Sequence, residues 1–89
     1  MFYASTQGSQ ELAKALQEAF VTHLNPGSNR QIKKCQGIYL MEHIQTPGVL
    51  VECGFLSNPA EEVKLRDVDY QKKICCVIAS ALSNYLANT

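Results

Sequence analysis

The chain has no excess charge of either sign and no long hydrophobic run. Eight lysines and arginines balance eight aspartates and glutamates. A nucleic-acid-binding domain usually carries a basic patch, so these interspersed charges predict no nucleic-acid partner. No segment reaches the roughly 20 apolar residues that span a bilayer, and no basic region precedes an apolar stretch near residue 1. We therefore expect neither a transmembrane segment nor a signal peptide within these residues.

Cysteine and histidine are too few and too irregularly placed to indicate a disulfide framework or a metal site. The cysteines are Cys35, Cys53, Cys75 and Cys76. They form no spaced set, and two neighbours on a helix point about 100° apart, so a disulfide scaffold is not expected. The two histidines, His23 and His43, belong to no metal-ligand spacing, whereas a catalytic zinc site needs about three protein ligands. We predict no metal site in this chain alone.

The first third of the chain predicts a strand followed by a helix. Residues 2–4 form a short strand candidate, and the polar residues 5–9 supply the N-cap of a helix that runs to about Leu24. Apolar residues recur along it at spacings of three and four, as on a helix that lies on a sheet: Leu12, Leu16, Ala19, Phe20 and Leu24. Asn25-Pro26-Gly27 ends this helix.

Two strands are predicted in the middle of the chain. A polar connection over residues 28–36 leads to a strand at residues 38–41. Thr46-Pro47-Gly48 then precedes a third strand at residues 49–51, which ends at Glu52.

Two helices are predicted after these strands. Asn58 is a strong N-cap candidate, because Pro59 takes the first helical position and Glu61 can reach back to the cap. This helix ends near Arg66, and the last helix begins at Asp67 or Asp69. The last helix carries a wide apolar stripe that should pack on the sheet: Tyr70, Ile74, Val77, Ile78, Ala81, Leu82 and Tyr85.

These elements predict an α/β protein, a three-layer sandwich fragment in which helices flank a short, mostly parallel sheet. At 89 residues the chain can bury roughly 60 to 65% of its unfolded surface, which supports one modest core. We expect one unit over residues 1–89.

Glu52 is the first candidate functional residue. Val49 to Val51 show no alternation, so the strand before Glu52 is predicted to be covered on both faces, as in parallel sheets. A buried carboxylate is costly unless it is paired, and ligands of open α/β sheets bind at the carboxyl ends of the parallel strands. The alternative is that Glu52 caps the strand or pairs with Arg30 or Lys34.

The stretch Leu50-Val51-Glu52-Cys53-Gly54-Phe55-Leu56-Ser57-Asn58 resembles the C-terminal signature of the zinc-dependent N-acetylmuramoyl-L-alanine amidases, the amidase-3 family of cell-wall hydrolases. Asn29-Arg30-Gln31-Ile32-Lys33 and Ile38-Tyr39-Leu40 are similar to the preceding segment in the spore-cortex, germination-specific branch. Asp69-Tyr70-Gln71-Lys72-Lys73-Ile74 is similar to the start of the family's last helix. The resemblance runs from about Phe2 to Leu86.

The resemblance implies that residues 1–89 are the C-terminal part of a catalytic domain normally on the order of 170 to 200 residues long. The zinc ligands of the family come from the N-terminal half, so zinc is implied for the complete enzyme and not for this chain. The implied activity is hydrolysis of the amide between N-acetylmuramic acid and L-alanine in peptidoglycan, with Glu52 as the general base. An extracytoplasmic, spore or cell-wall location is implied as well.

Other hypotheses remain open. Arg30 is a candidate for binding a stem-peptide carboxylate, against a merely solvated arginine. Asn58 could bind muramyl peptide but fits a helix cap better. Cys53 could be a nucleophile with His43 as its base, although a thiol in an apolar strand is more often inert. The main alternative function is a non-catalytic binding or assembly module that forms a homodimer through an uncovered sheet edge.

Overall fold

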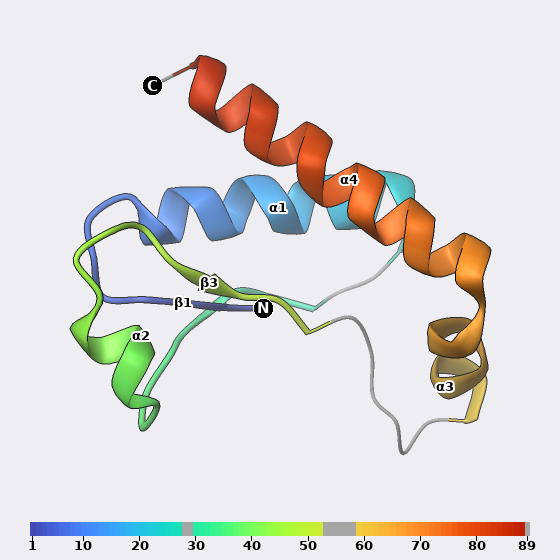
Figure 1. Ribbon diagram of the computed structural model, residues 1–89, viewed down its shortest axis with the longest axis horizontal. Helices are drawn as coiled ribbons and strands as arrows, with labels where there is room; N and C mark the ends of the chain where they lie inside the picture. The colour runs from blue at the N-terminus through green and yellow to red at the C-terminus, as the bar shows by residue number, and fades with distance from the viewer. Residues whose placement is uncertain (28–29, 53–58, 89) are drawn as a thin grey trace.

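The computed structural model describes residues 1–27, 30–52 and 59–88 (Figure 1). Within these ranges strands and helices follow one another in this order: β1 Phe2–Tyr3, α1 Ser9–His23, β2 Lys33–Lys34, α2 Tyr39–His43, β3 Val49–Leu50, α3 Pro59–Arg66 and α4 Val68–Ala87. The predicted α/β class is confirmed. The sheet itself is smaller than the helices around it.

The sheet is mixed rather than mostly parallel. Its order is β2-β1-β3, with β1 in the centre. β1 runs parallel to β2, with Phe2 opposite Lys33, and antiparallel to β3, with Phe2 opposite Leu50. The carboxyl end of β3 therefore lies at the same end of the sheet as the amino ends of β1 and β2.

Helices lie on both sides of the sheet. Figure 1 shows α1 and α4 on one side and α2 on the other, at one end only. On the α2 side Ala4, Cys35 and Met41 form a buried cluster. On the other side two clusters join α1 to α4, and the half-buried Val51 packs against both of them. The predicted layers are present, but α2 covers only part of its face.

The apolar stripe of α1 is buried as predicted, while its N-terminus differs from the prediction. Leu12, Leu16, Phe20 and Leu24 are buried. The N-cap residue is Gly8, whose φ of 91° is left-handed, and no side chain caps the helix. Glycine tolerates this φ because it has no Cβ. The polar stretch therefore begins the helix through its glycine rather than through a hydroxyl.

Ser9 links α1 to the loop before β3. Its side chain is fully buried, and its Oγ accepts a hydrogen bond of 3.0 Å from the Gly48 N–H. A Cβ on Gly48 would lie 2.2 Å from the Ile44 Cδ1, so backbone and side chains are closely packed here. Ser9 therefore satisfies a backbone donor that has little access to water.

We expect Ser9→Ala to lower the free energy of unfolding by about 1 to 3 kcal/mol, because the Gly48 N–H loses its acceptor. Urea denaturation followed by circular dichroism measures this loss. Ser5→Ala is the matched control, since the Ser5 side chain is exposed. Equal stabilities of Ser9→Ala and the wild type would contradict the assigned role.

The strand predicted at residues 38–41 is wrong: this segment contains the start of helix α2. Tyr39 and Leu40 are 76% and 66% exposed, and only Met41 of this helix is buried. The Glu42 carboxylate accepts a hydrogen bond of 2.8 Å from the Gly37 N–H, and the Glu42 N–H donates to the Ile38 carbonyl. These local bonds close a helical turn that the apolar run alone did not indicate.

The second strand lies instead at β2, inside the predicted polar connection. The Lys33 N–H donates to the Met1 carbonyl and the Cys35 N–H to the Tyr3 carbonyl, at 3.0 and 2.7 Å. Both lysine side chains are exposed. Because β2 is held by its backbone, its side chains carry no strand pattern.

The two C-terminal helices begin as predicted. α3 starts at Pro59, whereas Asn58 lies outside the described residues. Asp67 is the N-cap of α4, and its side chain accepts hydrogen bonds from the N–H groups of Asp69 and Tyr70. The apolar stripe of α4 packs mainly on α1 rather than on the sheet, through Ile74, Val77 and Ala81.

Removing the α4 cap should destabilise the chain. We expect Asp67→Ala to lower the free energy of unfolding by about 1 kcal/mol, because two N–H groups lose their acceptor. Asp67→Asn keeps an accepting oxygen and should retain most of the stability. Thermal unfolding of the three proteins tests this, and an Asp67→Asn loss as large as that of Asp67→Ala would contradict a hydrogen-bonding cap.

The cysteines in the described part of the chain are all free thiols. Cys35 is a buried free thiol, and Cys75 and Cys76 are exposed free thiols on α4. No described helix is both long and apolar enough to cross a bilayer.

Candidate functional site

Glu52 lies two residues after β3 and is exposed. The predicted burial of its strand on both faces is wrong, because β3 is an edge strand and Leu50 is 37% exposed. Val49 and Val51 pack toward α1 and α4, while Leu50 lies between them in sequence. One face of the apolar run thus packs against the helices. The other face has little cover from the described residues.

The parallel-strand argument for Glu52 also fails in this sheet. The carboxyl ends of the parallel pair β1 and β2 lie at the opposite end from Glu52, because β3 is antiparallel to β1. A cavity of about 340 Å³ lies at that opposite end, lined by Tyr3, Ala4, Ser5, Thr6, Gln7, Gly8, Gln10, Glu11 and Lys34. Glu52 therefore remains a candidate functional residue because of its exposure and its sequence context. The rule that ligands bind at the carboxyl ends of parallel strands does not support it here.

Arg30 lies at the same end of the sheet as Glu52. It precedes β2 by three residues, and its Nη2 donates to the Oε1 of Glu61 in the first turn of α3. The Glu52 carboxylate has no ion-pair partner among the residues that the structure describes. The alternative that Glu52 pairs with Arg30 or Lys34 therefore finds no support there.

Sequence reasoning did not identify Glu61 as the partner of Arg30. Glu61 was predicted to reach back to Asn58, which lies outside the described residues. The two side chains that do pair are 31 residues apart in sequence. No spacing rule connects residues that far apart, so only the fold reveals this pair.

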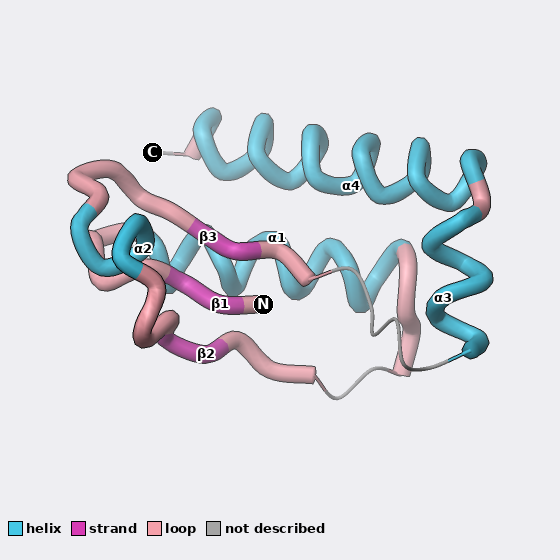
Figure 2. The backbone as a smooth tube through the Cα atoms, turned by 60° about the horizontal axis from the view of Figure 1, so that its bottom comes forward, coloured by secondary structure: helices cyan, strands magenta, loops and turns pink. Residues whose placement is uncertain are grey.

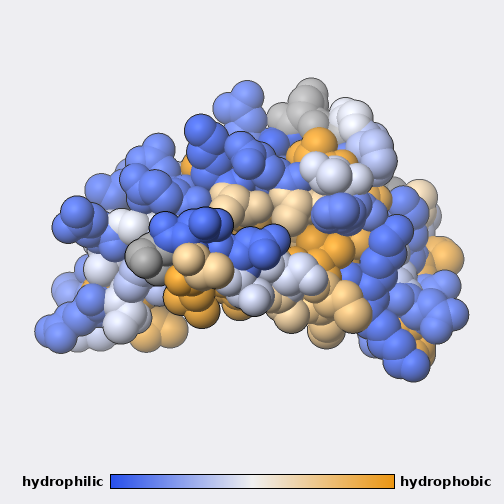
Figure 3. All heavy atoms as spheres, turned by 90° about the horizontal axis from the view of Figure 1, so that it is seen from above, coloured by the Kyte–Doolittle hydropathy of each residue, from blue (hydrophilic) through white to orange (hydrophobic). Residues whose placement is uncertain are grey.

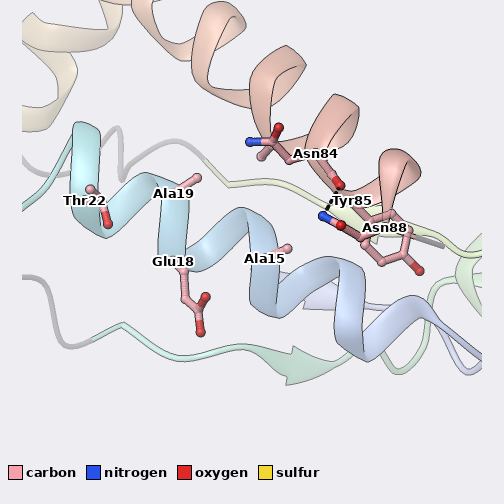
Figure 4. Close-up of a pocket in the computed structure, with 8 residues that line it drawn as sticks. Ala15, Glu18, Ala19, Thr22, Asn84, Tyr85 and Asn88 are labelled. Carbon is pink, nitrogen blue, oxygen red and sulfur yellow. Dashed lines mark hydrogen bonds between the residues drawn. The ribbon is translucent and has the colours of Figure 1, made fainter.

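A groove lies away from Glu52, between α1 and α4. Seen from the top of Figure 1, apolar residues form a band between polar margins (Figure 3). A cavity of about 420 Å³ opens there, lined by Ala15, Glu18, Ala19, Thr22, Ala81, Asn84, Tyr85 and Asn88. Figure 4 shows Asn84 on α4 and Asn88 at its C-cap, where the Asn88 Nδ2 donates to the Asn84 carbonyl at 2.8 Å. Small and amide-bearing side chains line most of this cavity, with the Glu18 carboxylate and the Tyr85 ring among them, and Glu52 is not part of the lining.

The free edge of β2 bears on the dimer hypothesis. Lys33 and Lys34 are exposed on this edge strand. Edge lysines disfavour the pairing of one sheet edge with another. A homodimer through β2 therefore gains no support from the structure, and dimerisation through the β3 edge remains a prediction.

Comparison with known proteins settles the family. A family model described as N-acetylmuramoyl-L-alanine amidase, the amidase-3 family, matches residues 1–84. The chain belongs to this family. The germination-specific N-acetylmuramoyl-L-alanine amidase of Bacillus subtilis (strain 168) is 34% identical over 84 residues, which are 94% of this chain and 35% of that protein.

A solved structure agrees with this assignment. The CwlD amidase from Clostridioides difficile, solved in complex with the GerS lipoprotein, superposes with a TM-score of 0.93 at 39% identity. The match covers 99% of this chain and 45% of that one. The amidase-3 chain described here thus spans about a third to a half of the length of these relatives. The family predicted from the signature around Glu52 is confirmed.

The two histidines of this amidase-3 chain end different helices. His23 ends α1 and is exposed. His43 ends α2, at the other end of the sheet, where its ring stacks on Tyr39 with a centroid distance of 4.1 Å. No group of three or more His, Cys, Asp or Glu side chains gathers among the described residues in a way that could hold a metal ion. The described residues therefore do not fit a zinc site by themselves.

The hypothesis of a Cys53 nucleophile depends on where its base lies. Cys53 lies outside the described residues. Its proposed base, His43, ends α2 at the opposite end of the sheet from Glu52. The Cys53 hypothesis therefore stays a prediction.

Proposed function

We propose that this chain supplies the general base, Glu52, to an N-acetylmuramoyl-L-alanine amidase that cleaves the amide between N-acetylmuramic acid and L-alanine in peptidoglycan. The observation that carries this proposal is an exposed carboxylate two residues past the end of β3, within a chain that belongs to the amidase-3 family. The hydrogen-bonded register with β1 fixes the backbone just before Glu52. A fixed backbone and an accessible carboxylate are what a general base requires.

The proposed reaction assigns two proton transfers to Glu52. Its carboxylate accepts a proton from the attacking water, so that the oxygen of the water can bond to the amide carbon. It then donates this proton to the departing amine of L-alanine as the carbon–nitrogen bond breaks. Zinc is part of the proposal only for the complete enzyme, with ligands from outside this chain, where it would supply a Lewis acid.

The substrate and the location follow from the same proposal. Peptidoglycan lies outside the cytoplasmic membrane, so we place the complete enzyme in an extracytoplasmic, spore or cell-wall compartment. Binding of a stem-peptide carboxylate by Arg30 stays a prediction, since the structure shows its guanidinium paired with Glu61.

A joined catalytic domain tests the proposed function. In it, the N-terminal part of the germination-specific amidase of Bacillus subtilis precedes residues 1–89 of this chain. We expect the joined domain, with zinc present, to hydrolyse a muramyl peptide and so free the amino group of its L-alanine. Either part alone should release no free amine. Failure of a folded, zinc-loaded joined domain to hydrolyse the substrate would contradict the proposed function.

A further inference from the structure

Glu52 lies beyond the hydrogen-bonded part of β3. The register with β1 ends at the pair of Phe2 and Leu50, so Val51 is the first residue past the paired strand and Glu52 is the second. Within the described sheet β3 is an edge strand, with β1 as its neighbour. Backbone pairing therefore holds the chain up to Leu50, and the position of Glu52 depends on what holds Val51.

Val51 is held by its side chain, which is half-buried in the helical layer. It packs against two buried clusters, one made of Phe20, Leu24, Ile74 and Val77 and the other of Leu12, Leu16 and Ala81. Figures 1 and 2 show β3 and the residues after it running along α1. Because branching at Cβ restricts the χ1 of valine, a packed Val51 side chain also restrains the backbone that carries it.

The burial pattern of β3 continues past its last paired residue. Val49 and Val51 pack toward the helices, whereas Leu50 and Glu52 are exposed. Successive side chains of an extended chain point to opposite faces, so a Val51 side chain fixed on the helical face directs Glu52 away from that face. Without this anchor, the backbone beyond Leu50 is free to rotate and to carry the Glu52 carboxylate with it.

The beginning of β3 is fixed in a different way. The Ala4 N–H donates to the Gly48 carbonyl at 2.9 Å, and the Gly48 N–H donates to the Ser9 Oγ at 3.0 Å. Val49 then lies opposite Tyr3 in the register with β1. The backbone at Val49 is thus restrained by hydrogen bonds on both sides of it, whereas Val51 relies on packing.

We propose that Val51 is a positioning residue, whose packing between α1 and α4 holds Glu52 in place for proton transfer. The role rests on the proposed function of Glu52 as the general base. Val51 itself has no group that can exchange a proton, so it acts only through the residue that follows it. A purely structural Val51 would contribute to stability and leave the order of Glu52 unchanged.

Amide nitrogen relaxation in the 89-residue chain tests this role without any need for activity. We expect an order parameter of about 0.85 for the Glu52 amide of the wild type, and a value below about 0.6 in Val51→Ala. Val49→Ala is the matched control, since it removes the same methyl groups from the same face of β3. It should leave Glu52 rigid, because the pair of Phe2 and Leu50 remains. Val51→Ile keeps a branched apolar side chain and should retain the wild-type value.

A second variant covers the case in which Val51→Ala does not fold. Val51→Thr keeps the branched shape but places a hydroxyl against the apolar clusters, so it should give an intermediate order parameter at Glu52. A Glu52 amide that neither Val51→Ala nor Val51→Thr makes more mobile would overturn the positioning role. So would a Val49→Ala variant that loosens Glu52 as much as the Val51 variants do.

Kinetics of the joined domain test the consequence for catalysis. Val51→Ala should lower kcat by about tenfold and leave KM within about twofold, because misplacing a catalytic group slows the chemical step. Val49→Ala should keep most of the wild-type kcat, and an equal loss of kcat in both variants would contradict the positioning role. An inactive joined domain with Val51 unchanged would contradict the proposed function instead. The relaxation measurement would still decide whether Val51 holds Glu52.

Discussion

Glu52→Gln is expected to lower kcat of the joined domain by about 10² to 10⁴-fold, the usual contribution of a general base. The amide of glutamine has nearly the same size as the carboxylate but cannot take a proton from water. The exposed position of Glu52 after β3 means that the replacement leaves no unpaired buried group. Release of free amine from a muramyl peptide measures the rate.

Two comparisons make this result specific. Glu18→Gln changes an exposed carboxylate in the middle of α1 and should leave kcat within about twofold, as for most surface replacements. The zinc content of Glu52→Gln should equal that of the unchanged joined domain, because Glu52 is proposed as a base and not as a ligand. Full activity of Glu52→Gln would remove Glu52 from the chemistry, and loss of zinc would make it a metal ligand.

Phe20→Ala is expected to have the largest effect on stability. Phe20 is 6% exposed and forms one buried cluster with Leu24 of the first helix region and with Ile74 and Val77 of α4. Removing a buried phenyl ring costs about 3 to 5 kcal/mol. Small domains have free energies of unfolding of roughly 5 to 15 kcal/mol, so most of the stability should disappear.

Urea denaturation followed by far-ultraviolet circular dichroism measures this loss. Phe20→Leu keeps most of the apolar volume and should lose much less. Thr22→Ala, on the exposed side of α1, should stay within about 0.5 kcal/mol of the wild type. A loss below about 1 kcal/mol for Phe20→Ala would show that the contact of α1 with α4 is not the main core.

The helices were largely predictable because their physical determinants are local. The stripe from Leu12 to Leu24, the proline at the start of α3 and the Asp67 cap lie within a few turns of the backbone that they control. The partner of the last helix was not predictable from its stripe. An apolar face fits either a sheet or another helix, and here α1 occupies it.

The strands were less predictable because their pairing is not local. β2 consists of two exposed lysines, which backbone hydrogen bonds to β1 hold in the sheet. The apolar residues at 38–41 lead into helix α2 instead of forming a strand. The direction of β3 was also missed, since an apolar run of three residues does not distinguish parallel from antiparallel pairing. Short strands take their register from distant partners, which periodicity does not encode.

The candidate site was predictable in part. The resemblance around Glu52 identified the family, which the comparison with known amidases confirmed. The argument from a doubly covered parallel strand reached the same residue by a geometry that this sheet does not have. The Glu61 partner of Arg30 was not predictable, because the ion pair joins side chains 31 residues apart in sequence.

The most direct test of the central claim is the zinc content of the 89-residue chain after equilibrium dialysis against dilute zinc, compared with that of the joined domain. The claim is that this chain contributes a general base to the amidase and no metal ligand. It predicts about one zinc per joined domain and close to none per isolated chain. One zinc per isolated chain, or one shared by two copies, would contradict the claim and would mean that residues of this chain build a metal site themselves.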